Sequence, residues 1–278
     1  MAEPQKAPSH PKYVWFNGEL VPWEKATVHV TQVEWSGVSA VFEGIKAYRN
    51  GGADQLHVFR LDEHMRRFGD SMRLMRMEPA WERKTLTAAL LELLRANETH
   101  GDTYIRPFAF FGAGRSFASR GDAATLVLIN THPFETILKT GKMINVAVSS
   151  WTRISDNVMP PRVKAVANYQ NSRLASTEAA LNGYDGAILL NERHKVSEGP
   201  GACIMMVRRG RVVTPPITAG VLESITLRVV KDLLERRMGV PLVEREVDRT
   251  ELYVADEVFL CGTGLELQAI GSVDRYQV

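Results

Sequence analysis

One lysine and one glutamate carry the clearest chemical signal in this sequence. Lys164 lies in the segment PPRVKAVANYQ, and Glu198 follows in the segment KVSEGPG. Burial disfavours the charged form of a lysine and lowers its pKa, and the neutral amine is the nucleophile that Schiff-base formation requires. A nearby acid could hold the ring nitrogen of a pyridoxal cofactor in its protonated form. An arbitrary lysine is more often a surface residue, so the surrounding sequence has to decide.

Apolar spacing and turn residues predict the elements that would position this pair. Lys164 is expected to precede a helix over about Tyr169–Leu181, which Gly183 would cap at its C-terminus. The runs GAILL and CIMMV read as strands on either side of the turn that contains Glu198. Ser224 is expected to cap a further helix, which ends by Gly239.

The N-terminal half gives equally clear local signals. Asn17-Gly18 stands between two apolar runs and predicts a β-hairpin. A helix is expected from Asp62, because apolar residues recur at spacings of three and four; this stripe is read as core rather than as a cofactor site. Its members are Met65, Phe68, Met72 and Met75.

Strand and helix signals alternate irregularly along the chain, which predicts an α+β fold in two domains. Residues 1–12 are expected to be a flexible tail and residues 13–130 a small N-terminal domain. A linker is expected over 131–138. Residues 139–278 would form the larger domain that carries Lys164. Ligand sites commonly form between two such domains.

Composition is that of an ordinary globular protein and narrows the functional classes. Of 278 residues, 45% are hydrophobic and 24% charged, and the formal net charge of +2 gives no reason to expect a nucleic-acid partner. No apolar run approaches 18 residues, so we expect no membrane span. Cys203 and Cys261 lie in apolar runs and read as buried thiols of a cytoplasmic protein. No metal site is expected.

Many segments, in order from about Tyr13 to the C-terminus, resemble the branched-chain amino-acid aminotransferases. Among them are VFEGIKAY, YIRP, SSWTR, KAVANYQNSRLA and VSEGPG. These enzymes belong to the fold-type IV pyridoxal-phosphate-dependent aminotransferases. The resemblance implies a smaller N-terminal and a larger C-terminal domain with pyridoxal 5'-phosphate between them, and a homodimer. Chains of this family usually continue some tens of residues past the stretch that matches GSVDRYQV, so a truncated chain or a partly ordered tail is expected.

The resemblance assigns the cofactor ring to three residues. Lys164 would hold the cofactor covalently and act as the general base. Tyr169 would donate a hydrogen bond to the phenolic oxygen of the ring, and Glu198 would face the pyridine nitrogen. Where the family commonly follows the glutamate with a Glu-Asn pair, this chain has Ala202-Cys203.

The cofactor phosphate is assigned to a second group of residues. Arg60 matches the phosphate arginine of the family, and a guanidinium suits a phosphate through bidentate geometry. Ile225 and Thr226 open the helix expected after Ser224, where free backbone N–H groups favour an anion. Thr263, in the segment CGTG, is a third phosphate contact that the resemblance implies.

The substrate residues follow from the same resemblance. Tyr104 and Arg106 fall on one face of a strand because side chains alternate with period two, and Arg106 would bind the distal carboxylate of glutamate or 2-oxoglutarate. Phe42 and Gly44 would line the pocket for aliphatic side chains. Gly264 would complete the substrate set.

Two departures from the family enlarge the expected pocket or make it less polar. Gly37 stands where a pocket tyrosine is usual, and Ile137 stands where another aromatic residue is common. They raise the possibility of (R)-amine or broader donor activity. In that case Arg115 or Arg120, in the segment GAGRSFASRGD, becomes the alternative partner of the acceptor carboxylate.

The resemblance implies ping-pong transamination between a branched-chain L-amino acid and 2-oxoglutarate, with small-molecule amino acids and 2-oxo acids as partners. The alternatives are an (R)-selective amine transaminase, a D-amino-acid transaminase or an aminodeoxychorismate lyase of the same fold. A pyridoxal-phosphate-binding protein without turnover is an alternative of a different class. The presence of Lys164, Glu198 and Arg60 argues against it.

Overall fold

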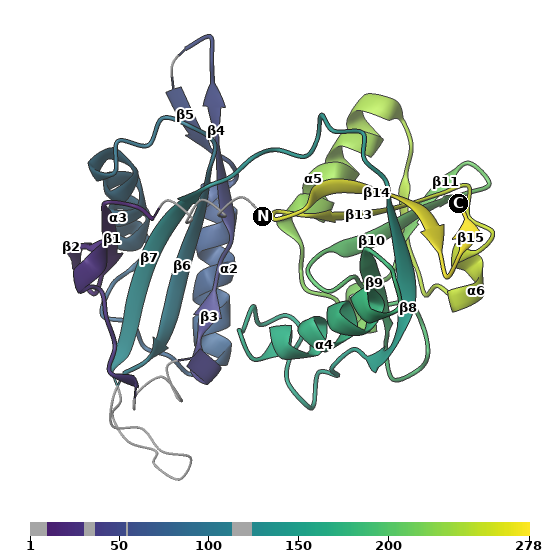
Figure 1. Cartoon of the computed structure of the whole chain (residues 1–278), viewed down its shortest axis with the longest axis horizontal. Coiled ribbons are helices and arrows are strands. Elements are labelled where there is room, and N and C mark those ends of the chain that lie inside the picture. The colour runs from purple at the N-terminus through teal and green to yellow at the C-terminus, as the bar shows by residue number, and fades with distance from the viewer. Residues whose placement is uncertain (1–9, 31–36, 54, 113–123) are drawn as a thin grey trace, which may run out of the picture. The chain divides into compact units, whose positions relative to one another are not determined.

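The chain divides into two compact units, Met1–Glu135 (unit 1) and Thr136–Val278 (unit 2). The computed structural model describes residues 10–30, 37–53, 55–112 and 124–278. Each unit combines a β-sheet with helices packed against it (Figure 1). The α+β class expected from the sequence is therefore confirmed.

Unit 1 is built around one sheet with the strand order β2-β1-β7-β6-β4-β5, and β3 pairs with β6. Two helices, α2 and α3, pack against each other and against this sheet (Figure 1). The strands are β1 (Tyr13–Phe16), β2 (Glu19–Pro22), β3 (Val41–Phe42), β4 (Ile45–Asn50), β5 (Gln55–Val58), β6 (Thr103–Phe111) and β7 (Thr125–Pro133), and the helices are α2 (Leu61–Leu74) and α3 (Arg83–Ala96).

The two central strands of unit 1 have one buried face and one half-exposed face. Ile105 on β6 and Val127 and Ile129 on β7 are fully buried, whereas the residues that alternate with them are partly exposed. This is the period-two pattern of a sheet that packs helices on one side only. The half-exposed face carries Tyr104 and Arg106.

A buried carboxylate ties the sheet of unit 1 to α2. Glu43 follows β3 and is fully buried. Its Oε1 accepts from Arg67 Nε at 2.7 Å and its Oε2 accepts from Arg67 Nη2 at 2.9 Å, while His64 Nδ1 lies 2.7 Å from Oε2. Burial alone would raise the pKa of this carboxyl, but Arg67 and His64 outweigh it and lower the pKa to about 2.

Unit 2 is built around a sheet with the order β12-β11-β10-β13-β14-β8-β9, and β15 pairs with β14. Its strands are β8 (Ile144–Thr152), β9 (Gly186–Leu190), β10 (Cys203–Arg208), β11 (Arg211–Thr214), β12 (Leu242–Glu244), β13 (Glu257–Gly262), β14 (Glu266–Val273) and β15 (Tyr276–Gln277). Its helices are α4 (Asn168–Leu181), α5 (Ile225–Leu233) and α6 (Arg249–Leu252).

Side chains that alternate along the strands of unit 2 belong in turn to two different apolar clusters. Ile204, Val258 and Leu260 belong to one cluster, whereas their strand neighbours Cys203 and Cys261 belong to the other, against which residues of α5 pack. Helix α4 packs on β8 and β9. None of the described helices is long and apolar enough to cross a membrane.

Most local predictions agree with the structure. Asn17 and Gly18 have positive φ angles between β1 and β2, as the hairpin requires. Gly183 follows α4 with a φ of +80°, and Ser224 accepts a hydrogen bond from the backbone N–H of Leu227 at 3.1 Å. Met75 differs: it lies at the C-cap of α2 and is only half-buried, so the buried stripe ends at Met72.

The expected linker and tail differ in extent from the structure. Residues 131–133 continue β7, because Thr131 pairs with Ile105 and is buried. The division between the units follows at Glu135. At the other end, the backbone carbonyl of Lys12 accepts from Trp23 N at 3.1 Å, so residues 10–12 belong to unit 1. Residues 1–9 of the expected tail lie outside the described residues.

Loss of the Glu43 charge is expected to destabilise the protein in a pH-dependent way. A carboxyl whose pKa falls from 4.5 to about 2 on folding contributes about 3 kcal/mol above pH 4.5, and this contribution is lost as the pH falls toward 2. Glu43→Gln should therefore lower the free energy of unfolding by about that amount at pH 7 and by less at pH 3.5. Urea denaturation at both pH values measures this.

The matched control is Glu98→Gln, because Glu98 forms an exposed ion pair with Lys12. This variant should barely change stability, since exposed pairs contribute little. A cost for Glu43→Gln that does not change with pH would contradict the assignment of Glu43 as a permanently charged buried group.

Candidate functional site

Lys164 lies in the loop before α4 and contacts a tyrosine in the first turn of that helix. Its Nζ donates to the hydroxyl of Tyr169 at 2.7 Å and lies 5.1 Å from the centroid of the ring. The loop is fixed by Asn168, whose Nδ2 donates to the carbonyls of Pro160 and Val163 at 3.1 and 3.0 Å. The half-buried amine of Lys164 is therefore held at a defined place, next to a phenol that can share its proton.

Glu198 is buried in the turn after β9 and forms an ion pair with Arg153. Arg153 Nη2 lies 2.7 Å from Glu198 Oε1, and both side chains are almost fully buried. The second carboxylate oxygen accepts from the backbone N–H of Leu222 at 3.2 Å. Arg153 also donates from Nε to the carbonyl of Gly220 at 3.2 Å, which fixes the guanidinium on both sides.

Burial raises the pKa of Glu198 above its ordinary value. Arg153, the N–H of Leu222 and the charge of Lys164 act in the opposite direction, but they do not outweigh the loss of hydration. The charge of Lys164 is among the causes that lower this pKa. Lys164, Tyr169 and Glu198 form the chemical constellation of unit 2, and their roles at a cofactor stay a prediction.

The N-terminus of α5 is a place where unit 2 can bind an anion. The Ser224 hydroxyl oxygen accepts a hydrogen bond from the backbone N–H of Leu227. The backbone N–H groups of Ile225 and Thr226, the first residues of the helix, have no acceptor within it. Helix α5 packs against β13, and Thr263 directly follows that strand. Gly262 allows a close approach here, because a Cβ at this position would lie 3.2 Å from the carbonyl of Gly201.

Arg60 occupies a special backbone position in unit 1. It forms the N-cap of α2 with a φ of +52°, in the left-handed region that few non-glycine residues adopt. Its Nη1 lies 2.9 Å from Oε1 of Glu63, and the side chain is 43% exposed. An exposed pair of this kind contributes little to stability. The contact with Glu63 alone therefore does not explain why Arg60 adopts this left-handed backbone conformation.

The four residues predicted to line the substrate pocket in unit 1 lie together. A Cβ at Gly44 would overlap the hydroxyl of Tyr104, so the glycine is required for this contact. The guanidinium carbon of Arg106 lies 5.5 Å from the centroid of the Phe42 ring. Arg106 also lies 4.8 Å from the centroid of Phe108, which stacks on Phe42. Gly264, the fifth predicted substrate residue, is exposed after β13 in unit 2.

The remaining sequence expectations have mixed outcomes. Arg115 and Arg120 lie outside the described residues. Gly37 is exposed, and a Cβ there would meet no described atom within 4 Å. The backbone N–H of Ile137 donates to Glu266 Oε2 at 2.8 Å within unit 2. Ala202 and Cys203 are buried core residues, and Cys203 lies opposite Cys261 on the neighbouring strand, both as thiols.

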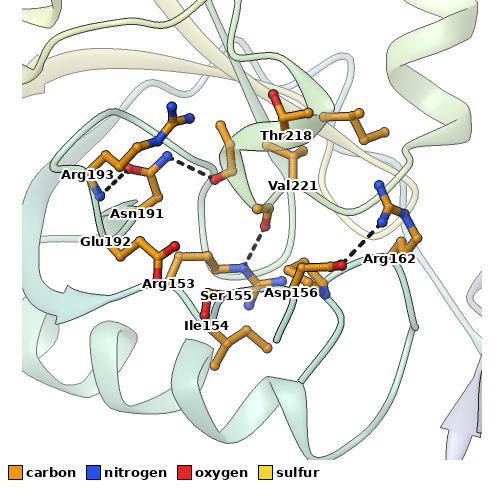
Figure 2. Close-up of a pocket in the computed structure, with 14 residues that line it drawn as sticks. Arg153, Ile154, Ser155, Asp156, Arg162, Asn191, Glu192, Arg193, Thr218 and Val221 are labelled. Carbon is orange, nitrogen blue, oxygen red and sulfur yellow. Dashed lines mark hydrogen bonds and ion pairs between the residues drawn. The ribbon is translucent and has the colours of Figure 1, made fainter. Parts of the chain in front are cut away.

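A pocket of about 230 Å³ lies beside the Arg153 side chain (Figure 2). Arg153 directs its Nε to the carbonyl of Gly220, Asp156 pairs with Arg162 at 3.2 Å, and Asn191 donates to Ala219 at 3.4 Å. None of Lys164, Tyr169 and Glu198 lines this pocket, but Arg153, the ion-pair partner of Glu198, does. Among the described residues no group of three or more His, Cys, Asp or Glu side chains could hold a metal ion.

Arg153 is the main site residue that sequence reasoning missed. It ends the segment SSWTR, directly after β8, and this segment is one of those that resemble the family. Its role depends on Glu198, which follows in the turn after β9. Only the parallel pairing of β8 with β9 brings the two residues together. The signal that the sequence offered was a basic residue, Arg153, at the end of a predicted strand in a segment that resembles the family.

Comparisons with known proteins identify the family of this chain. The family pattern described as amino-transferase class IV matches residues 40–273. A probable branched-chain-amino-acid aminotransferase of Aquifex aeolicus is 37% identical over 96% of this chain and 86% of its own length. The branched-chain amino acid aminotransferase of Thermobaculum terrenum, solved in its PLP form, matches with a TM-score of 0.94 at 47% identity, over 96% of this chain and 87% of that one.

A third match has a ligand of particular interest. The T.th. branched-chain amino acid aminotransferase, in complex with N-(5'-phosphopyridoxyl)-L-glutamate, matches with a TM-score of 0.88 at 32% identity, over 96% of this chain and 87% of that one. The chain therefore belongs to the class IV amino-transferase family and is an aminotransferase. Its structural relatives are branched-chain enzymes of fold type IV.

Removal of Arg153 is expected to destabilise unit 2 strongly. Breaking a buried ion pair by deleting one partner leaves an uncompensated charge, which costs about 3–5 kcal/mol. Arg153→Met should lower the free energy of unfolding by that amount at pH 8 and by less at pH 5. The sign follows because Arg153 lowers the pKa of Glu198, so its removal raises that pKa further, and the variant loses stability as the pH rises and the unpaired acid has to ionise.

The control is Arg162→Met, at an arginine that lines the same pocket but is 40% exposed. This change should cost less than about 1 kcal/mol. Equal losses for the two variants in urea denaturation would show that the Arg153–Glu198 pair has no special role.

Proposed function

We propose that this aminotransferase transfers the amino group of branched-chain L-amino acids to 2-oxoglutarate, with pyridoxal 5'-phosphate as cofactor. The observation that carries the proposal is the contact of Lys164 Nζ with the Tyr169 hydroxyl, together with the buried Glu198. The names of the relatives support the substrate class, and the PLP form of the Thermobaculum terrenum enzyme supports the cofactor.

The residues of unit 2 fit this cofactor. When bound, pyridoxal phosphate supplies an electron sink for bond breaking at the substrate Cα. Lys164 would attach it, and Tyr169 and Glu198 would offer hydrogen-bond partners for the phenolic oxygen and the ring nitrogen. The N–H groups of Ile225 and Thr226 and the hydroxyl of Thr263 suit its phosphate. Arg60 is proposed as the phosphate arginine, which would give its left-handed backbone a function.

The protein's own groups then perform two tasks. The neutral Nζ of Lys164 would take the proton from the substrate Cα as general base, and Tyr169 would accept or return a proton at that amine. Glu198, which Arg153 and the N–H of Leu222 hold in place, would face the ring nitrogen and favour its protonated form. Burial raises the pKa of Glu198, and the positive charge of a protonated ring nitrogen would act in the opposite direction, as Arg153 does.

Substrate selection is assigned to the half-exposed face of unit 1 and to Gly264. Phe42 and Gly44 would contact aliphatic side chains, and Arg106 would bind the distal carboxylate of 2-oxoglutarate. The phosphopyridoxyl-glutamate complex of the T.th. relative supports a dicarboxylate as the second substrate. We further propose a cytoplasmic homodimer: the buried thiols of Cys203 and Cys261 support the compartment, and the family resemblance supports the dimer.

The first test is covalent. Borohydride reduction of the loaded enzyme should attach a phosphopyridoxyl group to the peptide that contains Lys164, as peptide mass spectrometry would show. Lys164→Ala should abolish transamination of leucine, because both the attachment point and the base are lost. Lys195→Ala is the control, since Lys195 pairs with Asp248 away from the constellation, and it should keep turnover. A label on any other lysine would end the assignment.

The second test separates the two substrates. Arg106→Ala should slow the half-reaction of glutamate far more than that of leucine, because only glutamate loses an ion pair, worth about 2–5 kcal/mol when one partner is removed. Rapid-mixing absorbance measurements with each donor alone give both rates. General damage to the site would lower both equally, and the acceptor carboxylate would then have to be bound elsewhere. D-alanine and (R)-1-phenylethylamine in the same assay test the alternative donor classes.

A further inference from the structure

Polar groups on the half-exposed face of unit 1 extend beyond the predicted substrate residues. Strands β6 and β7 are antiparallel, with Tyr104 directly opposite His132 and Arg106 directly opposite Asn130. Residues opposite each other in an antiparallel pair project from the same face of the sheet. These four side chains therefore form a polar block, and the rings of Tyr104 and His132 lie 5.1 Å apart.

Arg106 brings a positive charge to this block without an acidic partner among the described residues. The guanidinium is half-buried and lies over the rings of Phe108 and Phe42, and it forms no hydrogen bond or ion pair with any described residue. The charge of Arg106 also acts on His132 of the neighbouring strand. Partial burial lowers the pKa of His132, and the positive charge of Arg106 lowers it further. A guanidinium has five N–H donors, and aromatic faces satisfy none of them as a carboxylate would.

Asn130, opposite Arg106, has an acceptor that lacks a described donor. Its side-chain oxygen is buried and has no hydrogen-bond partner in the described part of the chain. Buried polar atoms are nearly always hydrogen-bonded, so an exception calls for an explanation, such as a partner that arrives with a ligand. The residue directly across the strand pair is Arg106, whose N–H donors also lack a described acceptor. A set of donors and an acceptor without described partners thus lie opposite each other on one face of the sheet.

We propose that Asn130 is a specificity-determining residue for dicarboxylate substrates: its side-chain oxygen accepts an N–H from Arg106, and its side-chain NH₂ donates to the distal carboxylate of the substrate. This inference rests on the proposed function. With an aliphatic substrate, Arg106 remains over Phe42 and Phe108. With glutamate or 2-oxoglutarate, the guanidinium turns toward Asn130, and the pair presents parallel donors to the carboxylate. One face of the sheet thereby serves two unlike side chains.

Two substitutions at residue 130 test the proposal. Asn130→Leu keeps the approximate size and removes both polar groups, so the second-order rate constant of the glutamate half-reaction should fall about tenfold, while that of leucine stays within about twofold. Asn130→Asp places an acid opposite Arg106, which pairs with the guanidinium and repels the substrate carboxylate. The glutamate rate constant should therefore fall further than in Asn130→Leu.

Binding of glutarate to the loaded enzyme provides a readout without turnover. Calorimetric titration should show glutarate binding about tenfold more weakly to Asn130→Leu than to the wild-type enzyme. Thr131→Val is the matched control, because Thr131 is the next residue of β7 and its side chain is buried on the opposite face. This variant should leave the ratio of leucine to glutamate rates unchanged.

The outcomes distinguish this inference from the proposed function. A wild-type enzyme that reacts with neither leucine nor glutamate refutes the proposed function, and the glutarate titration still decides the role of Asn130. If the wild-type enzyme reacts with both donors but Asn130→Leu lowers both rates equally, only the inference is overturned. Unchanged glutarate affinity in Asn130→Leu, or an Asn130→Asp variant no slower with glutamate than Asn130→Leu, overturns it as well.

Discussion

A carboxylate removed from water has to be matched by cations and hydrogen-bond donors, and this constraint organises both units of the chain. In unit 1, Glu43 connects the strand that bears Phe42 to helix α2, through Arg67 and His64. In unit 2, Glu198 connects the turn after β9 to the end of β8, through Arg153. Each buried acid therefore fixes a loop next to residues that are assigned to the chemistry, and neither loop can shift without exposing or separating a charge pair.

Glu43 and Glu198 receive different numbers of hydrogen bonds and ion-pair contacts, and this difference fits different tasks. Glu43 receives two bonds from one guanidinium and a third contact from His64, and its pKa falls to about 2. Glu198 receives one guanidinium nitrogen and one backbone N–H, and burial still raises its pKa. Glu43 is thus charged at every physiological pH and suits a structural role. Glu198 has fewer partners than its burial calls for, and a protonated ring nitrogen would supply a further one.

Local signals in the sequence were sufficient for elements whose causes are local. The hairpin at Asn17-Gly18 and the helix cap at Ser224 depend on the backbone preferences of single residues, and both are present. The shared face of Tyr104 and Arg106 follows from strand periodicity alone. The contact between Lys164 and Tyr169 spans only five positions of a segment that the family resemblance also marks.

Features that depend on strand pairing were beyond the reach of sequence reasoning. The expected linker began at residue 131, yet pairing with β6 keeps Thr131 in β7. The ion pair of Arg153 with Glu198 and the Glu43–Arg67–His64 cluster were not predicted either, because their partners lie far away in the sequence. Asn130 also gains its meaning only from the residue across the strand pair. The family resemblance supplied roles for residues but not these supporting contacts.

The contact between Gly44 and Tyr104 sets a boundary for any attempt to widen the substrate range by mutagenesis. Any side chain at residue 44 would displace the Tyr104 hydroxyl, so that position belongs outside a library that aims to keep the pocket intact. Gly37 is the opposite case, because a Cβ there meets no described atom within 4 Å and its backbone imposes no glycine requirement. Among the described residues nothing opposes a side chain at residue 37, whereas residue 44 has to remain glycine for the Tyr104 contact to persist, so a library aimed at the proposed pocket would vary the first position and keep the second.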